Sequence, residues 1–154
     1  MIKNIDQLLD SFVNVANLSG FKISISDISY DFWEAPHRQK GLPSNQQAVY
    51  TFSLPKFNNL VLKIGKAGPK SNARFLSQHY NPDSSGSNLA KSLLNSINFW
   101  EEIQIQKPQY HQICGWIKAN TDRNNFYVSD KFDKRLLSLF EIFLQCRLSP
   151  VFEK

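Results

Sequence analysis

Three chemically capable side chains fall within one stretch of the chain, residues 48–80. Tyr50 and Lys63 lie in two predicted strands joined by a short turn, and Arg74 lies in the helix predicted to follow them. A short connection favours an antiparallel hairpin over a crossover, so the three side chains can meet at one end of a two-stranded ribbon. A guanidinium group grips phosphate through its planar fork, and charged neighbours shift the pKa of a phenol. The stretch is therefore a candidate site for chemistry on an anionic group.

A fourth candidate, Glu141, lies on the apolar face of the last predicted helix, which runs over residues 130–148. It follows Leu137 by four residues and precedes Leu144 by three. A carboxylate on such a face is costly unless it is paired or bound to a metal ion. The alternative is that Glu141 lies at the edge of the apolar face and reaches solvent.

The elements that must position these side chains are indicated by residue type. Residues 48–52 and 60–64 are rich in aromatic and β-branched side chains and predict two strands. Residues 65–70 contain glycine and lysine and predict a flexible, basic loop. A helix is predicted over residues 73–80, because polar capping residues precede it and an Asn-Pro pair follows it.

The rest of the chain supplies helices and further strands around this hairpin. Apolar residues at spacings of three and four indicate helices, and alternation indicates strands. In chain order, the sequence predicts a helix over residues 2–17, a strand over 21–26, a polar connector over 30–47, helices over 89–100 and 110–117, and a strand over 125–128. A strand over residues 114–118 is the alternative for part of the second inserted helix.

The order of these motifs resembles the GIY-YIG nuclease family, in which a Gly-Ile-Tyr strand pairs with a Tyr-Ile-Gly strand and a helix carrying an arginine follows. Here the two strand motifs are residues 48–50 (Ala-Val-Tyr) and 63–65 (Lys-Ile-Gly), and the helix carries Arg74. Glu141 matches the family's glutamate on the helix after the third strand. Lysine replaces the first tyrosine of the second motif, and Glu153 stands where the family usually has an asparagine.

The resemblance implies a metal-dependent endonuclease that hydrolyses DNA phosphodiester bonds. Glu141 would hold Mg²⁺ or Mn²⁺, which prefer oxygen ligands, and Arg74 would grip the scissile phosphate. Tyr50 would orient or deprotonate the attacking water, and Lys63 would lower the Tyr50 pKa or contact the phosphate. The family often has a histidine or tyrosine one helical turn after the arginine, where this sequence has Gln78; His79, one residue later at the end of the motif helix, would swing toward the phosphate.

Contacts to the nucleic acid are expected from Lys56, Lys66, Lys70 and Tyr80. The formal net charge of +5 favours an anionic partner. One constellation hydrolyses one strand, so cutting both strands of a palindromic site predicts a homodimer on DNA. A restriction enzyme or another defence or mobile-element nuclease fits these features. Two alternatives stay open: a non-catalytic nucleic-acid-binding module on the same fold, and a nuclease toxin.

The expected fold is of the α/β class (α+β type), a small, mainly antiparallel, three-stranded sheet flanked by helices and GIY-YIG-like. The 154 residues suffice for a single domain. Its parts are an N-terminal helix and strand extension (1–46), the motif hairpin and helix (47–80), a helical insertion (81–124), and the third strand with the glutamate-bearing helix (125–154).

Composition excludes disordered and membrane-spanning classes. Hydrophobic residues make up 42% of the chain and aromatic residues 13%, which is typical of a globular domain. No apolar run approaches the roughly 18 residues that span a bilayer, and Asp6 and Asp10 interrupt any signal-peptide pattern. We therefore expect a cytoplasmic protein with no membrane partner. Cys114 and Cys146 lack metal-binding spacing and are expected to be buried free thiols.

Overall fold

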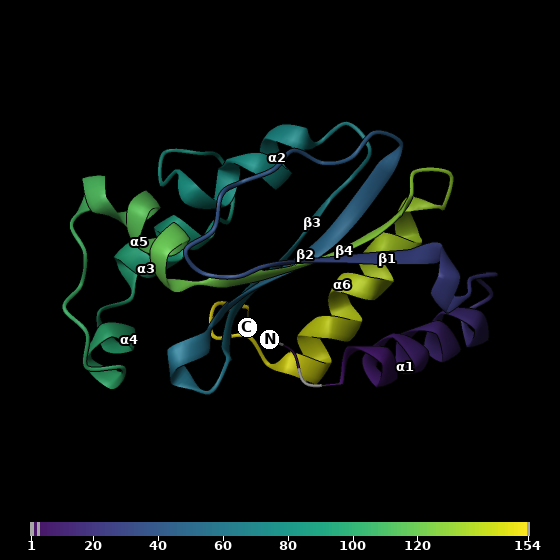
Figure 1. Cartoon of the computed structure of the whole chain (residues 1–154), viewed down its shortest axis with the longest axis horizontal. Helices are drawn as coiled ribbons and strands as arrows, with labels where there is room; N and C mark the ends of the chain where they lie inside the picture. Colours follow the sequence, from purple (N-terminus) through teal and green to yellow (C-terminus); the bar gives the residue numbers. More distant parts are fainter. Residues whose placement is uncertain (1, 3, 154) are drawn as a thin grey trace.

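A four-stranded antiparallel sheet forms the middle layer of the molecule, with helices on both faces (Figure 1). The computed structural model describes residue 2 and residues 4–153. The strands lie in the order β1 (Ile28–Trp33), β4 (Asp122–Ser129), β2 (Gln46–Leu54) and β3 (Leu60–Ala67). β2 and β3 pair as the predicted antiparallel hairpin, and β3 forms one edge of the sheet.

The prediction of three strands is wrong, because a fourth strand lies at the other edge of the sheet. β1 pairs with β4 along its whole length and takes up the start of the predicted connector. The strand predicted over residues 21–26 does not form. Asp27 Oδ2 accepts hydrogen bonds from the backbone N–H and the hydroxyl of Ser24, at 2.8 and 2.7 Å, and these local bonds favour a 3-10 turn instead.

One face of the sheet is covered by α1 (Ile5–Leu18) and α6 (Lys134–Leu148). The longer C-terminal helix lies on β2 and β3, and the N-terminal helix packs against it (Figure 1). The rings of Phe12 and Phe140 stack between the two helices, with their centroids 3.9 Å apart. Val49 and Phe126 contribute the sheet's side of this core.

The other face is covered by four short helices. They are α2 (Asn72–Leu76), α3 (Leu89–Asn95), α4 (Ile97–Glu102) and α5 (Ile113–Asn120). The inserted region is helical, as predicted, but extended backbone at Ser96 divides its first helix in two. The motif helix is shorter than predicted, since α2 ends at Leu76 and the 3-10 turn η3 (Gln78–Tyr80) follows.

The last strand begins at Asp122, three residues earlier than predicted, although its first four side chains are polar. These side chains form interactions inside the protein. The Asn124 side chain donates a hydrogen bond to the Thr51 hydroxyl at 3.0 Å and accepts one from the Tyr30 hydroxyl at 2.8 Å. Residues 122–125 are therefore buried polar residues of a strand, although their types alone predict a turn.

The glutamate-bearing helix begins at Lys134 rather than near residue 130. Asp133 caps it by accepting a hydrogen bond from the backbone N–H of Arg135 at 2.8 Å. Both cysteines are free, but Cys146 is exposed and Cys114 is half-buried, so the expectation of two buried thiols is wrong. None of the helices formed by the described residues has the length and apolar content to cross a membrane.

Candidate active site

Tyr50 lies in the middle of β2, and its side chain is fully buried. Its partner across the hairpin is Gly65. A Cβ atom at Gly65 would lie 2.8 Å from Tyr50 Cε2 and 3.0 Å from the hydroxyl oxygen. Glycine at position 65 therefore leaves room for the phenol ring of Tyr50 to lie across β3. A larger residue at position 65 would displace that ring.

His79 fixes the hydroxyl of Tyr50. The backbone N–H of Leu89 donates to His79 Nδ1 at 3.2 Å, so Nδ1 carries a lone pair. In the neutral imidazole the proton is then on Nε2, which lies 2.9 Å from the Tyr50 hydroxyl oxygen. His79 Nε2–H donates to that oxygen, and His79 in this tautomer cannot accept the phenolic proton.

The surroundings of His79 keep its ring neutral. Burial lowers the pKa of His79 well below its ordinary value, and the positive charges of Arg123, Lys63 and Arg74 lower it further. The side chain is 1% exposed, which does not agree with the expected swing toward a phosphate. His79 instead acts on the site through Tyr50.

Arg74 lies on α2 and reaches the same hydroxyl from the solvent side. Burial raises the pKa of Tyr50, and the charge of Arg123, the charge of Arg74 and a hydrogen bond from Arg74 lower it. The nearby carboxylate of Glu141 raises the Tyr50 pKa again. The structure thus brings Tyr50, Arg74 and Glu141 together, and the phenol is neutral in the resting protein.

The side chain of Glu141 is mostly buried, and its carboxylate is paired with a lysine. Its Oε2 atom lies 2.7 Å from Lys66 Nζ, and the glutamate and lysine side chains are 15% and 35% exposed. The same ammonium group donates to the Ser138 hydroxyl at 3.0 Å. Lys66, expected to contact nucleic acid, is therefore part of the glutamate's immediate surroundings, one residue beyond Gly65.

The residues present fit a weakly held divalent ion rather than a dedicated metal cage. Among the residues that the structure describes, no three His, Cys, Asp or Glu side chains cluster as metal ligands. Mg²⁺ is often bound by one or two carboxylates, several waters and substrate phosphates. Lys66 contacts one carboxylate oxygen of Glu141, and the second oxygen is the one suited to such an ion.

Lys63 has a different partner from the one predicted. Its side chain is 2% exposed, and Nζ lies 2.6 Å from Glu153 Oε1 and 2.9 Å from the Ser87 hydroxyl. The ammonium group is thus held by the C-terminal segment instead of the Tyr50 hydroxyl. Two of the positions that differ from the motifs the sequence resembles, Lys63 and Glu153, form one ion pair with each other.

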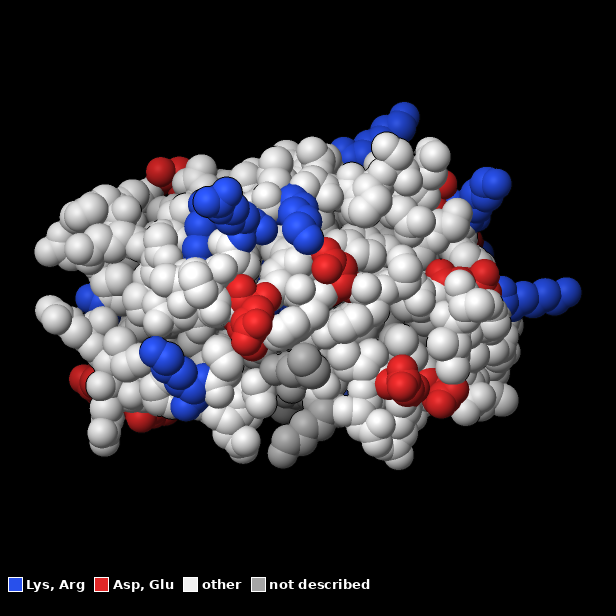
Figure 2. Space-filling model, viewed as in Figure 1, with Lys and Arg blue, Asp and Glu red and all other residues white. Residues whose placement is uncertain are grey.

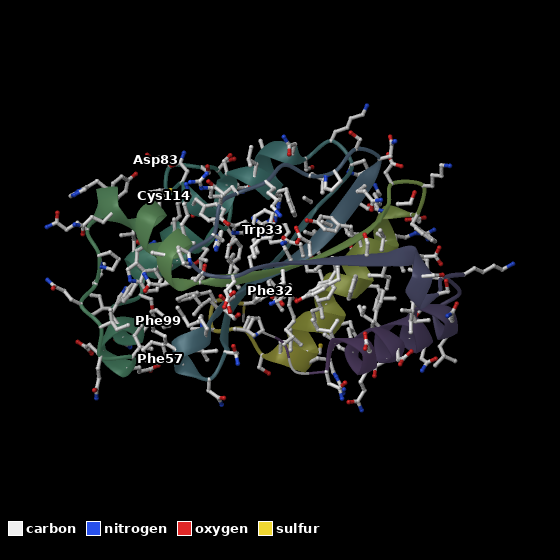
Figure 3. All side chains as sticks on the ribbon, in the orientation of Figure 1. Phe32, Trp33, Phe57, Asp83, Phe99 and Cys114 are labelled. Atoms are coloured by element: carbon white, nitrogen blue, oxygen red, sulfur yellow. The ribbon has the colours of Figure 1, made fainter. Side chains whose placement is uncertain are left out.

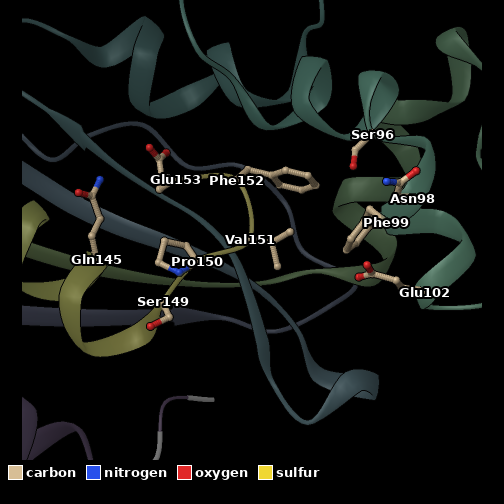
Figure 4. Close-up of a pocket in the computed structure, with 10 residues that line it drawn as sticks. All are labelled: Ser96, Asn98, Phe99, Glu102, Gln145, Ser149, Pro150, Val151, Phe152 and Glu153. Atoms are coloured by element: carbon tan, nitrogen blue, oxygen red, sulfur yellow. The ribbon is translucent and has the colours of Figure 1, made fainter.

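The C-terminal segment lies along the edge of β3 (Figure 4). The backbone N–H groups of Val151 and Phe152 donate to the carbonyls of Val61 and Leu62, each at 3.0 Å. A cavity of about 770 Å³ is lined by this segment and α4, and Glu153 and Glu102 are among its lining residues (Figure 4). The segment therefore closes the exposed edge of the hairpin and carries the partner of Lys63.

The remaining expected nucleic-acid contacts are scattered. Lys70 is exposed next to α2. Lys56 is exposed in the hairpin turn, beyond Leu54 and so more than about 13 Å along the strand from Tyr50. Figure 3 shows the neighbouring Phe57 in that turn, away from the middle of the sheet.

Tyr80 is buried, unlike a residue that contacts a bound nucleic acid. Its side chain is 2% exposed. His37 Nδ1 donates to the Thr121 carbonyl at 2.8 Å, so His37 Nε2 accepts a hydrogen bond from the Tyr80 hydroxyl at 2.8 Å. Burial is the main cause that lowers the pKa of His37. The structure therefore places Tyr80 in the core beneath the site.

The surface charge is mixed on the face in Figure 2. Lys and Arg side chains alternate there with Asp and Glu side chains, without one continuous basic patch. The net charge of +5 is therefore not concentrated on this face.

Arg123 is a residue of the site that the sequence analysis missed. It lies in β4, in a polar run that resembles a turn, and its side chain is fully buried. The guanidinium carbon lies 4.3 Å from the centroid of the Tyr50 ring. Nothing in the local sequence distinguishes it from a surface arginine.

Comparison of the chain with protein-family models, with curated proteins and with solved structures finds no match.

We expect acid to destabilise the protein through His79 and His37. Both have a pKa lowered in the folded state, so below about pH 6.5 the unfolded chain binds more protons and the stability falls as the pH falls. Each should reduce the free energy of unfolding by up to about 1.4 kcal/mol per pH unit until its folded-state pKa is reached. Urea unfolding at a series of pH values measures this slope.

His79→Gln and His37→Gln should each make that dependence shallower, and His111→Gln, at an exposed position, serves as the control. An unchanged slope in both buried variants would show that these histidines are not held neutral.

We expect Glu153→Gln to destabilise the protein, because it leaves the buried ammonium group of Lys63 without its carboxylate. Breaking a buried pair costs about 3 to 5 kcal/mol, and the lower end applies because Glu153 is 25% exposed. The double variant Lys63→Met with Glu153→Gln should recover most of the loss. Thermal and urea unfolding measure both, and a single variant as stable as the wild type would contradict the pairing.

Proposed function

We propose that this chain is a GIY-YIG-type nuclease that hydrolyses phosphodiester bonds in DNA. The observation that carries the proposal is the Tyr50 hydroxyl, which accepts a hydrogen bond from His79 Nε2–H and lies beside Arg74. The Glu141–Lys66 pair lies near that hydroxyl. A phenol, a guanidinium and a carboxylate in one place are the groups that this reaction needs.

Arg74 would bind the scissile phosphate. It is exposed, so its guanidinium is accessible to a phosphodiester at the molecular surface, and its planar fork matches two phosphate oxygens. Positive charge there would stabilise the extra negative charge that develops on the phosphate in the transition state.

Tyr50 would orient the attacking water, or take its proton once the neutral phenol has itself lost a proton to solvent. The N–H of His79 and the side chain of Arg74 both favour negative charge on the phenolic oxygen, whereas burial disfavours it. His79 already carries its proton on Nε2, so it stabilises the phenolate and does not act as the base. The rotation of the phenol is restricted by its contact with Gly65, which keeps the oxygen aimed at one position.

Glu141 would hold Mg²⁺ or Mn²⁺. When bound there, the ion would neutralise charge on the leaving oxygen and on one phosphate oxygen. Lys66 lies on the same carboxylate and would contribute a second positive charge beside the phosphate. A homodimer on DNA would place two such sites on opposite strands, as a restriction or other defence nuclease needs.

One observation favours a second candidate, a nucleic-acid-binding module without cleavage. Lys66 occupies one oxygen of the only carboxylate placed to hold an ion among the described residues around Tyr50. In a binding module this ion pair would be permanent, and binding would depend steeply on salt without any effect of Mg²⁺.

We expect Mg²⁺-dependent nicking of supercoiled plasmid by the wild type, and a loss of about 100-fold or more in Arg74→Ala and Glu141→Gln. Arg74→Lys is the matched control: it keeps the charge but loses the planar fork, so it should recover only part of the rate. Arg74 is exposed, so its variants should unfold at the wild-type temperature. Near-wild-type nicking by folded Arg74→Ala would contradict the proposed mechanism, and DNA binding without nicking by the wild type would favour the binding module.

A further inference from the structure

The side chain of Arg123 is enclosed by aromatic rings behind Tyr50. Its guanidinium carbon lies 4.2 to 5.1 Å from the centroids of four rings, those of Phe75, Tyr50, Trp33 and Phe52. Figure 3 labels Trp33 over the middle of the sheet. Guanidinium groups are attracted to ring faces at such distances. The cage therefore fixes the arginine and the Tyr50 ring relative to each other.

Arg123 also contacts the neighbours of the two other residues that reach the Tyr50 hydroxyl. Its Nη1 donates to the carbonyl of Phe75 at 2.9 Å and to the hydroxyl of Tyr80 at 3.3 Å. Phe75 follows Arg74 on α2, and Tyr80 follows His79 in η3. One side chain thus ties β4 to the phenol ring and to both segments that carry its hydrogen-bond donors.

Part of this arrangement is costly for stability, and the contacts with the ring faces offset some of that cost. Nε and Nη2 of Arg123 are buried without a hydrogen-bond acceptor among the described residues. Burying a charge with incomplete hydrogen bonding costs free energy, and an apolar side chain of similar length often fills such a space with equal or greater stability. Packing alone therefore does not account for an arginine at this position.

We propose that Arg123 is a positioning residue of the site, holding the Tyr50 ring from behind and aligning Arg74 and His79 with its hydroxyl. This inference rests on the proposed function and deepens it. Arg123 does not touch the substrate, because its side chain is fully buried among four aromatic rings.

The charge of Arg123 supports the same role. The charged or titratable groups that act on the Tyr50 hydroxyl are Arg123 from β4, Arg74 from α2, His79 from η3 and Glu141 from α6. Arg123 is the largest of the influences that lower the pKa of Tyr50 against the effect of burial. It also lowers the pKa of His79, which keeps that ring a neutral donor. Without Arg123 the phenolate should form less readily.

The test compares Arg123→Met, which fills the cage without charge, with Arg123→Lys, which keeps the charge without the fork. Single-turnover cleavage of plasmid DNA with Mg²⁺, thermal unfolding, and NMR of isotope-labelled tyrosine are measured on each full-length protein.

We expect Arg123→Met to unfold at or above the wild-type temperature and to cleave about 100-fold more slowly, because a misplaced reacting group costs about that factor. DNA affinity should change less than about threefold, and the pH dependence of the rate should move to higher pH. Arg123→Lys should recover part of the rate and of the pH profile.

Two results would overturn the inference while leaving the nuclease in place. One is a folded Arg123→Met protein that cleaves like the wild type. The other is a loss of rate that follows the loss of stability in both variants with an unchanged pH profile, which is what a purely structural arginine would give.

If the wild type itself does not cleave, the proposed function fails. The NMR signal of Tyr50, assigned by comparison with Tyr50→Phe, then decides whether Arg123 positions the ring. A signal that shifts in Arg123→Met and returns toward the wild-type position in Arg123→Lys supports it; an unmoved signal overturns it.

Discussion

The hydrogen bond from His79 Nε2–H to the Tyr50 hydroxyl is the interaction on which the rest of the site depends. It exists because the Leu89 backbone N–H occupies the other ring nitrogen and so selects the tautomer. That contact requires α3 to begin at Leu89 and η3 to follow α2 closely, so the inserted helices act on the site directly. The insertion is therefore a structural part of the site, and the chemistry of Tyr50 depends on where α3 lies.

The elements that carry Tyr50, Arg74 and Glu141 were predictable because each rests on a local pattern: strand-forming residues, a short connection to a helix, and an apolar helical face. The roles of these residues in the reaction stay predictions. The hairpin and the helical insertion were predictable for the same reason. Arg123 and the first residues of β4 were not, because polar side chains of this kind normally indicate a turn. Only the folded protein supplies the aromatic cage around the arginine and the acceptors for its neighbours. The fourth strand was missed because the residues that pair between β1 and β4 are 90 (Trp33 and Arg123) to 100 (Ile28 and Val128) positions apart in the chain.

The partners of the two lysines in β3 could not be read from local sequence either. Lys63 and Lys66 were expected to act on the substrate, and each is instead paired with a carboxylate from the C-terminal part of the chain. The Lys63–Glu153 pair joins two positions at which the sequence differs from the motifs that it resembles, and a buried ammonium group requires a carboxylate nearby. The Lys66–Glu141 pair keeps a positive charge beside the proposed ion-binding carboxylate. The partners of the two lysines thus distinguish their roles. Lys63 is held in a structural ion pair with Glu153, whereas Lys66 is paired with Glu141 in the proposed site.

The central claim is that the Tyr50 hydroxyl takes part in phosphodiester hydrolysis, and Tyr50→Phe tests it most directly. The variant removes one oxygen atom and retains the ring that packs against Gly65 and Arg123. In single-turnover cleavage of supercoiled plasmid with Mg²⁺, the account predicts a rate at least about 100-fold below that of the wild type, with retained DNA binding. Tyr110→Phe, at an exposed position, should cleave at the wild-type rate. A folded Tyr50→Phe protein that cleaves as fast as the wild type, or a wild type that leaves the plasmid intact, would contradict it.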